Sequence, residues 1–170
     1  MGTVTAVSDE VLADLIADLT QRGLTIATAE SLTGGGLVAR LVDVPGASHV
    51  VRGGACTYAV DTKSSVLGVS ASQLALTGPV DEQVARQMAR GARTLFRADI
   101  GVSTTGVAGP GPADGFDAGT VHIACVHPAG EEHRLLHLDG DRAAVRAGAI
   151  DAALALVRDV LDCAGAQAGD

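Results

Sequence analysis

The segment TYAVDTK holds the only tyrosine and the only lysine of the chain, Tyr58 and Lys63, five positions apart. Lysine and arginine together number 12, so the other eleven basic residues are all arginines. A lysine can lose its proton in a suitable environment, whereas an arginine guanidinium effectively cannot. Lys63 is therefore a candidate general base. Most surface lysines are inert, however, and this segment taken alone favours that simpler interpretation.

A candidate nucleophile for this base is Ser31, which follows an apolar segment and precedes the glycines at 34–36. A serine at this position can equally be the cap of the next helix, as can Thr33. A helix that begins on glycines offers free backbone N–H groups, which suit a phosphate or a developing oxyanion. Cap and nucleophile need the same local geometry, so these residues leave both roles open.

Other catalytic and binding patterns are weak. Gly34, Gly36 and Ala39 match the dinucleotide-binding pattern G-x-G-x-x-A, but the acidic residue expected further along is not convincingly placed. The chain has no P-loop and no G-x-S-x-G elbow. His133 and His137 lie about 13 Å apart on an expected strand, so we interpret them as packed or solvated side chains. A nucleophile here needs a base other than histidine.

The bulk composition limits the class of protein. A chain of 170 residues is long enough for one domain with its own core, which must be aliphatic because aromatic residues make up only 2%. A net charge of −8 without a basic run argues against nucleic acid or an anionic membrane as partner. No segment approaches the ~20 apolar residues of a membrane span, and no signal peptide is recognisable, so we expect a cytoplasmic protein. The three cysteines are widely spaced, which favours reduced thiols over disulfides or a zinc site.

Apolar periodicity and capping residues predict how these side chains are positioned. The expected helices are residues 9–22, 33–41, 62–67, 72–76, 81–96 and 142–161, with Ser8 and Asp61 as caps and Gly23 as a stop. The expected strands are residues 24–29, 50–59, 98–105, 120–126 and 133–138, the last two forming a hairpin, with a bulge or close contact at Gly53 and Gly54. Residues 106–119 form a loop long enough to be functional. This order indicates an α/β fold, a single three-layer α/β/α domain with a mixed, mostly parallel sheet.

Several sequence blocks together resemble one known family, the CinA C-terminal domain or nicotinamide-nucleotide amidase family. The blocks are AESLTGG at 29–35, DVPGAS at 43–48, RGGACTYAVDTKSSVLGV at 52–69, GPVDEQVARQMARGAR at 78–93, TTGVAGP at 104–110, GTVHIA at 119–124 and GDRAAVR at 140–146. The resemblance covers about residues 8–161. Longer family members carry an additional N-terminal domain related to molybdopterin-binding proteins, so we expect a single amidase-like domain over residues 1–170 without it.

The resemblance implies hydrolysis of nicotinamide mononucleotide to nicotinic acid mononucleotide and ammonia, without metal or cofactor. The family's catalytic serine, tyrosine and lysine fall on Ser31, Tyr58 and Lys63. The matching blocks also imply a set of substrate-binding residues: Glu30, Thr33, Gly34, Gly35, Thr105, Gly106, Gly109, Pro110, Gly119, Thr120 and Arg142. A homodimer is a further expectation. The alternative is a non-catalytic nucleotide-binding module that acts through a protein partner in competence or the response to DNA damage.

Three departures from the family pattern lie close to these residues. Leu32 replaces the usual cysteine, Val60 replaces an asparagine between the tyrosine and the lysine, and GPGPADG at 109–115 replaces G-P-D-G-G. The nucleophile and the base are intact, so the departures bear on which substrate is taken.

The proposed chemistry places a demand on Lys63. A free lysine has a pKa of about 10.4, whereas a useful base near neutral pH needs roughly 7 to 8, a difference of ~4 kcal/mol. The start of a helix supplies only ~0.3 to 1 kcal/mol of this, so burial has to supply the rest. The hypothesis is that neutral Lys63, steadied by the Tyr58 hydroxyl, deprotonates Ser31. Backbone N–H groups around Thr33 to Gly35 then hold the oxyanion.

Overall fold

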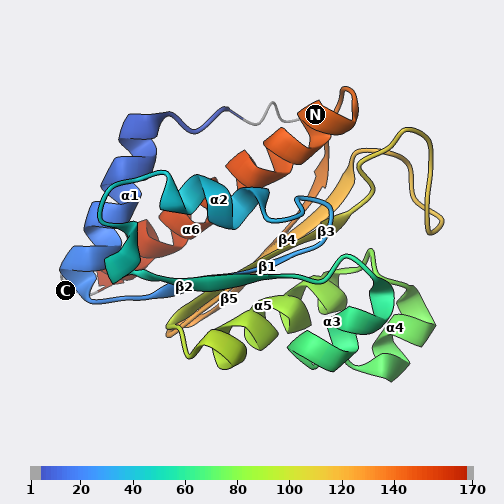
Figure 1. Cartoon of the computed structure of the whole chain (residues 1–170), viewed down its shortest axis with the longest axis horizontal. Coiled ribbons are helices and arrows are strands. Elements are labelled where there is room, and N and C mark those ends of the chain that lie inside the picture. The colour runs from blue at the N-terminus through green and yellow to red at the C-terminus, as the bar shows by residue number, and fades with distance from the viewer. Residues whose placement is uncertain (1–4, 168–170) are drawn as a thin grey trace.

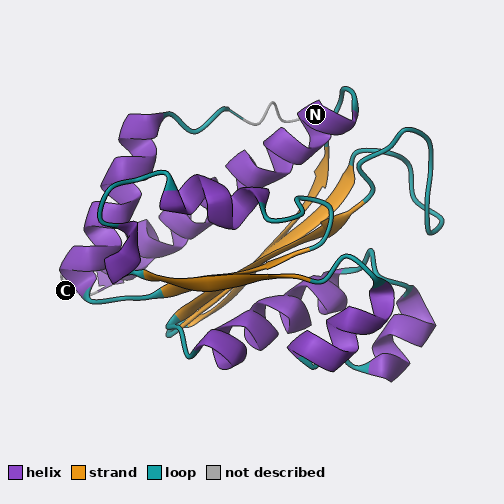
Figure 2. Ribbon diagram, viewed as in Figure 1, coloured by secondary structure: helices purple, strands orange, loops and turns teal. Residues whose placement is uncertain are grey.

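A computed structural model, which describes residues 5–167, contains one five-stranded sheet between two layers of helices (Figure 1, Figure 2). The sheet has the order β2-β1-β3-β4-β5. The strands are β1 Ile26–Glu30, β2 Val51–Cys56, β3 Ile100–Gly106, β4 Thr120–His127 and β5 Gly130–His137. The helices are α1 Asp9–Arg22, α2 Gly36–Val42, α3 Val60–Leu67, α4 Ala71–Thr77, α5 Glu82–Phe96 and α6 Arg142–Gln167, with a 3-10 turn at Ala47–His49. No described helix is long and apolar enough to span a membrane.

The sheet is mixed, as predicted. Strand β1 is parallel to β2 and β3, whereas β4 is antiparallel to β3 and β5. Four strands therefore run in one direction and β4 runs against them. Helices α1, α2 and α6 cover one face and α3, α4 and α5 cover the other (Figure 1). The three-layer α/β/α architecture is confirmed.

The central strand β1 shows why this sequence suits a doubly covered sheet. All five of its residues, IATAE, are buried, as expected for a strand with helices on both faces. Ile26 joins the larger core with α1, α2 and α6, whereas Ala27 and Ala29 join the smaller core with α5. Side chains alternate along a strand, so Glu30 faces the same layer as Ile26, the layer that contains α2.

Local signals fix several element boundaries. The Ser8 hydroxyl accepts from the N–H of Val11 at the start of α1, and Gly23 ends that helix at φ 64°. The register of β2 with β1 shifts between Val51 and Gly53, so a bulge lies at Arg52, directly before the glycines where a bulge or a close contact was predicted. Gly53 lies against the Phe96 ring, where a Cβ would come within 2.7 Å of a ring carbon. These predictions are confirmed.

Other predicted boundaries are wrong, each for a local reason. The helix expected from Thr33 begins at Gly36, because a turn occupies the preceding residues. Asp61 does not cap α3, since the N-cap is Ala59 and no side chain bonds there; Lys63 still lies in the first turn. Strand β2 ends at Cys56 rather than at residue 59. The hairpin turn is only residues 128–129, so β5 begins earlier than predicted, and α6 continues to Gln167.

Candidate active site

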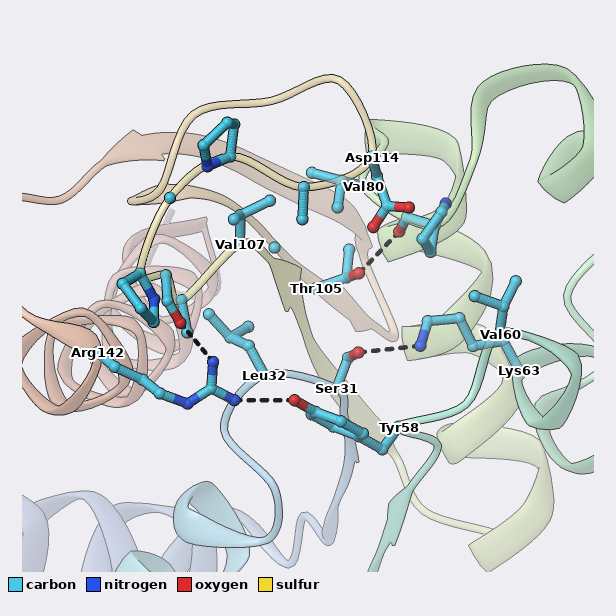
Figure 3. A pocket seen from close by; sticks show the side chains of 18 residues that line it. Ser31, Leu32, Tyr58, Val60, Lys63, Val80, Thr105, Val107, Asp114 and Arg142 are labelled. Atoms are coloured by element: carbon cyan, nitrogen blue, oxygen red, sulfur yellow. Dashed lines mark hydrogen bonds between the residues drawn. The ribbon is translucent and has the colours of Figure 1, made fainter.

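A cavity of about 250 Å³ lies where the carboxyl ends of β1, β2 and β3 meet (Figure 3). Ser31 follows β1, Tyr58 follows β2, and Thr105 lies at the end of β3. Lys63 enters from α3, and Arg142 enters from the start of α6. Parallel strands that end at one edge bring residues distant in sequence together, which is how open α/β sheets form their sites.

The centre of the cavity is a hydrogen bond between Lys63 and Ser31. The Lys63 Nζ lies 2.9 Å from the Ser31 Oγ and 2.5 Å from the carbonyl oxygen of Thr57. Lys63 is fully buried, and Ser31 is 9% exposed. Burial lowers the pKa of Lys63 from 10.5 to about 8, although the negative charge of Asp114 opposes the shift. The expectation that burial must supply the shift is therefore confirmed.

Glu30 determines the shape of the turn that carries Ser31. This carboxylate is fully buried and accepts from the backbone N–H groups of Gly35, Leu37 and Val38 at 2.8 to 2.9 Å. The hydroxyls of Thr28 and Thr33 also donate to it, at 3.0 and 2.8 Å. The anion that suits the start of α2 is therefore built into the chain.

This arrangement corrects the predicted oxyanion donors. The N–H of Gly35 donates to Glu30, and the N–H of Gly34 donates to the carbonyl of Ser31. Neither group is available to a substrate. Within residues 5–167, the N–H groups of Leu32 and Thr33 have no hydrogen-bond acceptor. Of these two residues only Leu32 lines the cavity, so its N–H group is the one placed for a developing negative charge.

Arg146, on α6, fixes the same turn from the other side. Its Nε donates to the carbonyl of Leu32 at 3.0 Å and its Nη2 donates to the carbonyl of Thr33 at 2.9 Å. These two bonds hold consecutive carbonyl groups of the turn. Arg146 therefore fixes the backbone next to Ser31 and the Leu32 N–H group.

Tyr58 lines the cavity, but the predicted hydrogen bond between its hydroxyl and Lys63 is not formed. Its hydroxyl accepts from the Arg142 Nη2 at 2.8 Å, and its side chain is 62% exposed. Arg142 also donates to the carbonyl of Gly109 at 2.6 Å. The backbone carbonyl of Thr57, rather than the phenol, takes the second donor position on Lys63. Tyr58 and Arg142 together form a polar edge of the cavity.

The loop at residues 106–119 forms another wall and is tied down at both its base and its tip. At the base, the N–H of Gly119 donates to Val107 at 2.7 Å. At the tip, Ala113 and Phe116 exchange two backbone hydrogen bonds of 3.0 and 2.9 Å around Asp114 and Gly115. The loop thereby places Asp114 in the cavity wall.

The chain is similar in sequence to proteins of one known family. The family model of the CinA C-terminal domain matches residues 8–161. The chain belongs to the CinA C-terminal domain family. A CinA-like protein of Frankia casuarinae is 44% identical over 160 residues, covering 94% of this chain and 37% of the relative. A putative competence-damage inducible protein of Desulforamulus reducens is 42% identical, and the match covers 92% of this chain and 38% of the relative. The chain thus spans less than two fifths of these curated relatives.

Solved CinA structures agree with the fold. The competence/damage inducible protein CihA of Agrobacterium tumefaciens superimposes with a TM-score of 0.87 at 35% identity, covering 95% of this chain and 99% of that one. A CinA superfamily protein of Escherichia coli gives a TM-score of 0.83 at 32% identity, and the match covers 93% of this chain and 95% of that one. The domain described here therefore corresponds to nearly the whole of each of these structures.

The predicted site residues of this CinA domain divide into two groups. Those that line the cavity are Ser31, Tyr58, Lys63, Thr105, Gly106, Gly109, Pro110 and Arg142. Those that do not line it are Glu30, Thr33, Gly34, Gly35, Gly119 and Thr120. The second group has structural contacts instead. Glu30 and Thr33 bond each other beneath the serine turn, and Gly119 packs so closely that a Cβ would lie 2.0 Å from the Leu138 oxygen.

Two important residues were not predicted, Asp114 and Arg146. The only sequence signal for Asp114 is the dipeptide Asp-Gly, which strongly favours a two-residue turn. Arg146 ends the block GDRAAVR of the family resemblance, but no local signal predicts its contacts, because its partners lie more than a hundred positions away.

The histidines and cysteines lie outside this cavity. His122 Nδ1 and His133 Nε2 are 2.9 Å apart. The pKa of each of these side chains is lowered, mainly by burial. Cys56, Cys125 and Cys163 are free thiols, and burial raises the pKa of Cys125 to about 12. Among the described residues, no group of three or more histidine, cysteine, aspartate or glutamate side chains is placed to hold a metal ion.

Proposed function

We propose that this protein hydrolyses the carboxamide of nicotinamide mononucleotide, giving nicotinic acid mononucleotide and ammonia. The observation that carries the proposal is the buried Lys63 amine, 2.9 Å from the Ser31 hydroxyl at the centre of the cavity. A serine next to a lysine of lowered pKa is a nucleophile with its base, and it requires no histidine. Membership of the CinA C-terminal domain family supports this choice of reaction.

The first step is proton transfer from Ser31 to neutral Lys63. With a pKa of about 8, about one Lys63 side chain in eleven is neutral at pH 7. At the ordinary pKa of 10.5 the share is only about one in three thousand. The Thr57 carbonyl accepts one N–H of the amine and directs its lone pair toward the serine. Burial thus raises the reactive fraction by more than two orders of magnitude.

In the second step, the Ser31 oxygen bonds to the amide carbon and the carbonyl oxygen becomes negative. The N–H group of Leu32 is the donor available to that oxygen, and such a preorganised donor stabilises the transition state. The C–N bond breaks as the Lys63 ammonium returns its proton to the nitrogen, and ammonia leaves. Water then attacks the acyl ester, with Lys63 again as the base, and restores Ser31.

The polar edge formed by Tyr58 and Arg142 suits the phosphate of the substrate. A guanidinium matches the geometry of a phosphate, and the Arg142 side chain is already held by two hydrogen bonds. The Tyr58 hydroxyl, in this mechanism, positions Arg142 rather than Lys63. This assignment replaces the support of Lys63 by the Tyr58 hydroxyl that was expected from the sequence.

Ammonia release from nicotinamide mononucleotide tests the proposal directly. The wild-type protein should turn the substrate over, and Ser31→Ala and Lys63→Arg should each lower kcat by more than about a thousandfold. Lys63→Arg keeps the positive charge but removes the base. If Lys63→Arg kept wild-type activity, Lys63 would not be the base. Binding of the nucleotide without turnover would instead favour the non-catalytic module.

A further inference from the structure

The Asp114 side chain has a position that the proposed mechanism does not use. Asp114 and Gly115 are the two central residues of the tight turn at the tip of the loop, with φ values of 53° and 83°. Two positive φ values are those of a type I′ turn, the connection that Asp-Gly favours. The turn therefore fixes the backbone of Asp114, and its side chain lines the cavity beside Thr105 (Figure 3).

Asp114 and Arg142 give the cavity two opposite charges. In Figure 3 Arg142 lies to the left of Ser31, whereas Asp114 lies above it. Among the side chains that the structure describes, Asp114 forms no ion pair. Its charge is nevertheless close enough to Lys63 to raise the pKa of that amine. A ligand whose amide reaches Ser31 thus places the ring that carries the amide within the field of Asp114.

We propose that Asp114 selects substrates in which the ring that carries the amide is positively charged. This inference rests on the proposed function and deepens it. In nicotinamide mononucleotide the pyridine nitrogen is quaternary, so the ring is a cation, whereas the reduced dihydropyridine nucleotide has the same amide and phosphate on a neutral ring. Asp114 attracts only the cationic ring of the oxidised nucleotide, whereas Arg142 binds the phosphate of both nucleotides.

The same charge assists the release of product. Hydrolysis converts the neutral amide into a carboxylate beside Ser31, within reach of the field of Asp114. Two like charges in one cavity repel, so the acid product is held less tightly than the amide. Because Asp114 is exposed, solvent screens its charge, and we expect an effect of about 3- to 10-fold rather than several orders of magnitude.

The experiment compares kcat/KM for oxidised and reduced nicotinamide mononucleotide in the wild type, Asp114→Asn and Asp117→Asn. Asparagine tolerates positive φ, so the turn is retained. Asp117 is a matched control, because it is an exposed aspartate of the same loop that does not line the cavity. Any change in the basicity of Lys63 affects both substrates equally and cancels in the ratio of their kcat/KM values.

Asp114→Asn should lower the preference for the oxidised substrate about 3- to 10-fold, mainly through a higher KM, and Asp117→Asn should leave it unchanged. An unchanged preference in Asp114→Asn, or a wild type without preference, would overturn the inference. If the wild type hydrolyses neither compound, the proposed function fails, and calorimetric binding of the same two ligands decides the inference alone. Tighter binding of the oxidised form that is lost in Asp114→Asn would support it, and equal binding would refute it.

Discussion

Replacing the only lysine of the chain by methionine should make stability less dependent on pH. The pKa of Lys63 falls from 10.5 to about 8 on folding, and a pKa unit corresponds to about 1.36 kcal/mol. At pH 7 the buried ammonium therefore lowers the free energy of unfolding by about 3 kcal/mol. Between pH 8 and 10.5 the unfolded chain binds more protons than the folded one, so stability rises with pH in this window. At pH 10 the remaining penalty is about 1 kcal/mol.

Lys63→Met removes this titration while keeping an unbranched side chain of similar length. The variant loses the hydrogen bond to the Thr57 carbonyl, which costs about 1 to 3 kcal/mol at every pH. The change in stability that depends on pH is separate from this loss. We expect the stability of the variant relative to the wild type to fall by about 2.5 kcal/mol from pH 7 to pH 10, because only the wild type gains over that range.

Urea denaturation at pH 7 and pH 10 measures this change. Ser31→Ala is the control, because it keeps the lysine and should show the wild-type dependence on pH. A protein labelled at lysine also gives a single side-chain NMR signal, which should titrate near pH 8, as should the rising limb of kcat/KM. A stability difference that is independent of pH, together with a lysine signal that titrates near 10.5, would refute the argument.

Two further predictions concern the turn that carries Ser31. Glu30→Gln puts an NH₂ group against backbone N–H donors and should lower the free energy of unfolding by roughly 2 to 4 kcal/mol, measured by urea denaturation; a loss below 0.5 kcal/mol would contradict the capping role. Arg146→Met releases the Leu32 and Thr33 carbonyls and should lower kcat about 10- to 100-fold in steady-state assays with KM little changed, and Arg146→Lys should restore part of it. Equal losses in Arg146→Met and Arg146→Lys would argue against positioning by hydrogen bonds.

The features that the sequence predicts best are those with local causes. The cap at Ser8 and the stop at Gly23 depend on contacts within a few residues of each helix end, so they follow from residue type. The pairing of Ser31 with Lys63 spans 32 positions, and it was expected because the family resemblance assigns both residues. Arg146, by contrast, reaches the serine turn from 113 and 114 positions away, and neither its type nor its neighbours predict those bonds.

The errors in the predicted site also have physical causes. Gly34 and Gly35 were expected to present free N–H groups because glycines begin a helix. The carboxylate of Glu30, at the end of the preceding strand, instead accepts from the N–H of Gly35, and the N–H of Gly34 donates to the Ser31 carbonyl. Tyr58 was expected next to Lys63 because the family resemblance assigns the two residues as a pair. The Tyr58 side chain instead points toward Arg142, which donates to its hydroxyl. The separation of two residues in the sequence does not determine the directions of their side chains.

The buried carboxylate of Glu30 has a consequence for how substrate binding energy is used. The start of a helix binds anions, and where a site becomes ordered only on binding, part of the affinity is spent on ordering the protein. In this protein the charge is part of the chain, and it holds the serine turn before any ligand arrives. Contacts made to the substrate are therefore free to act on the reaction itself, by favouring the transition state over the bound amide.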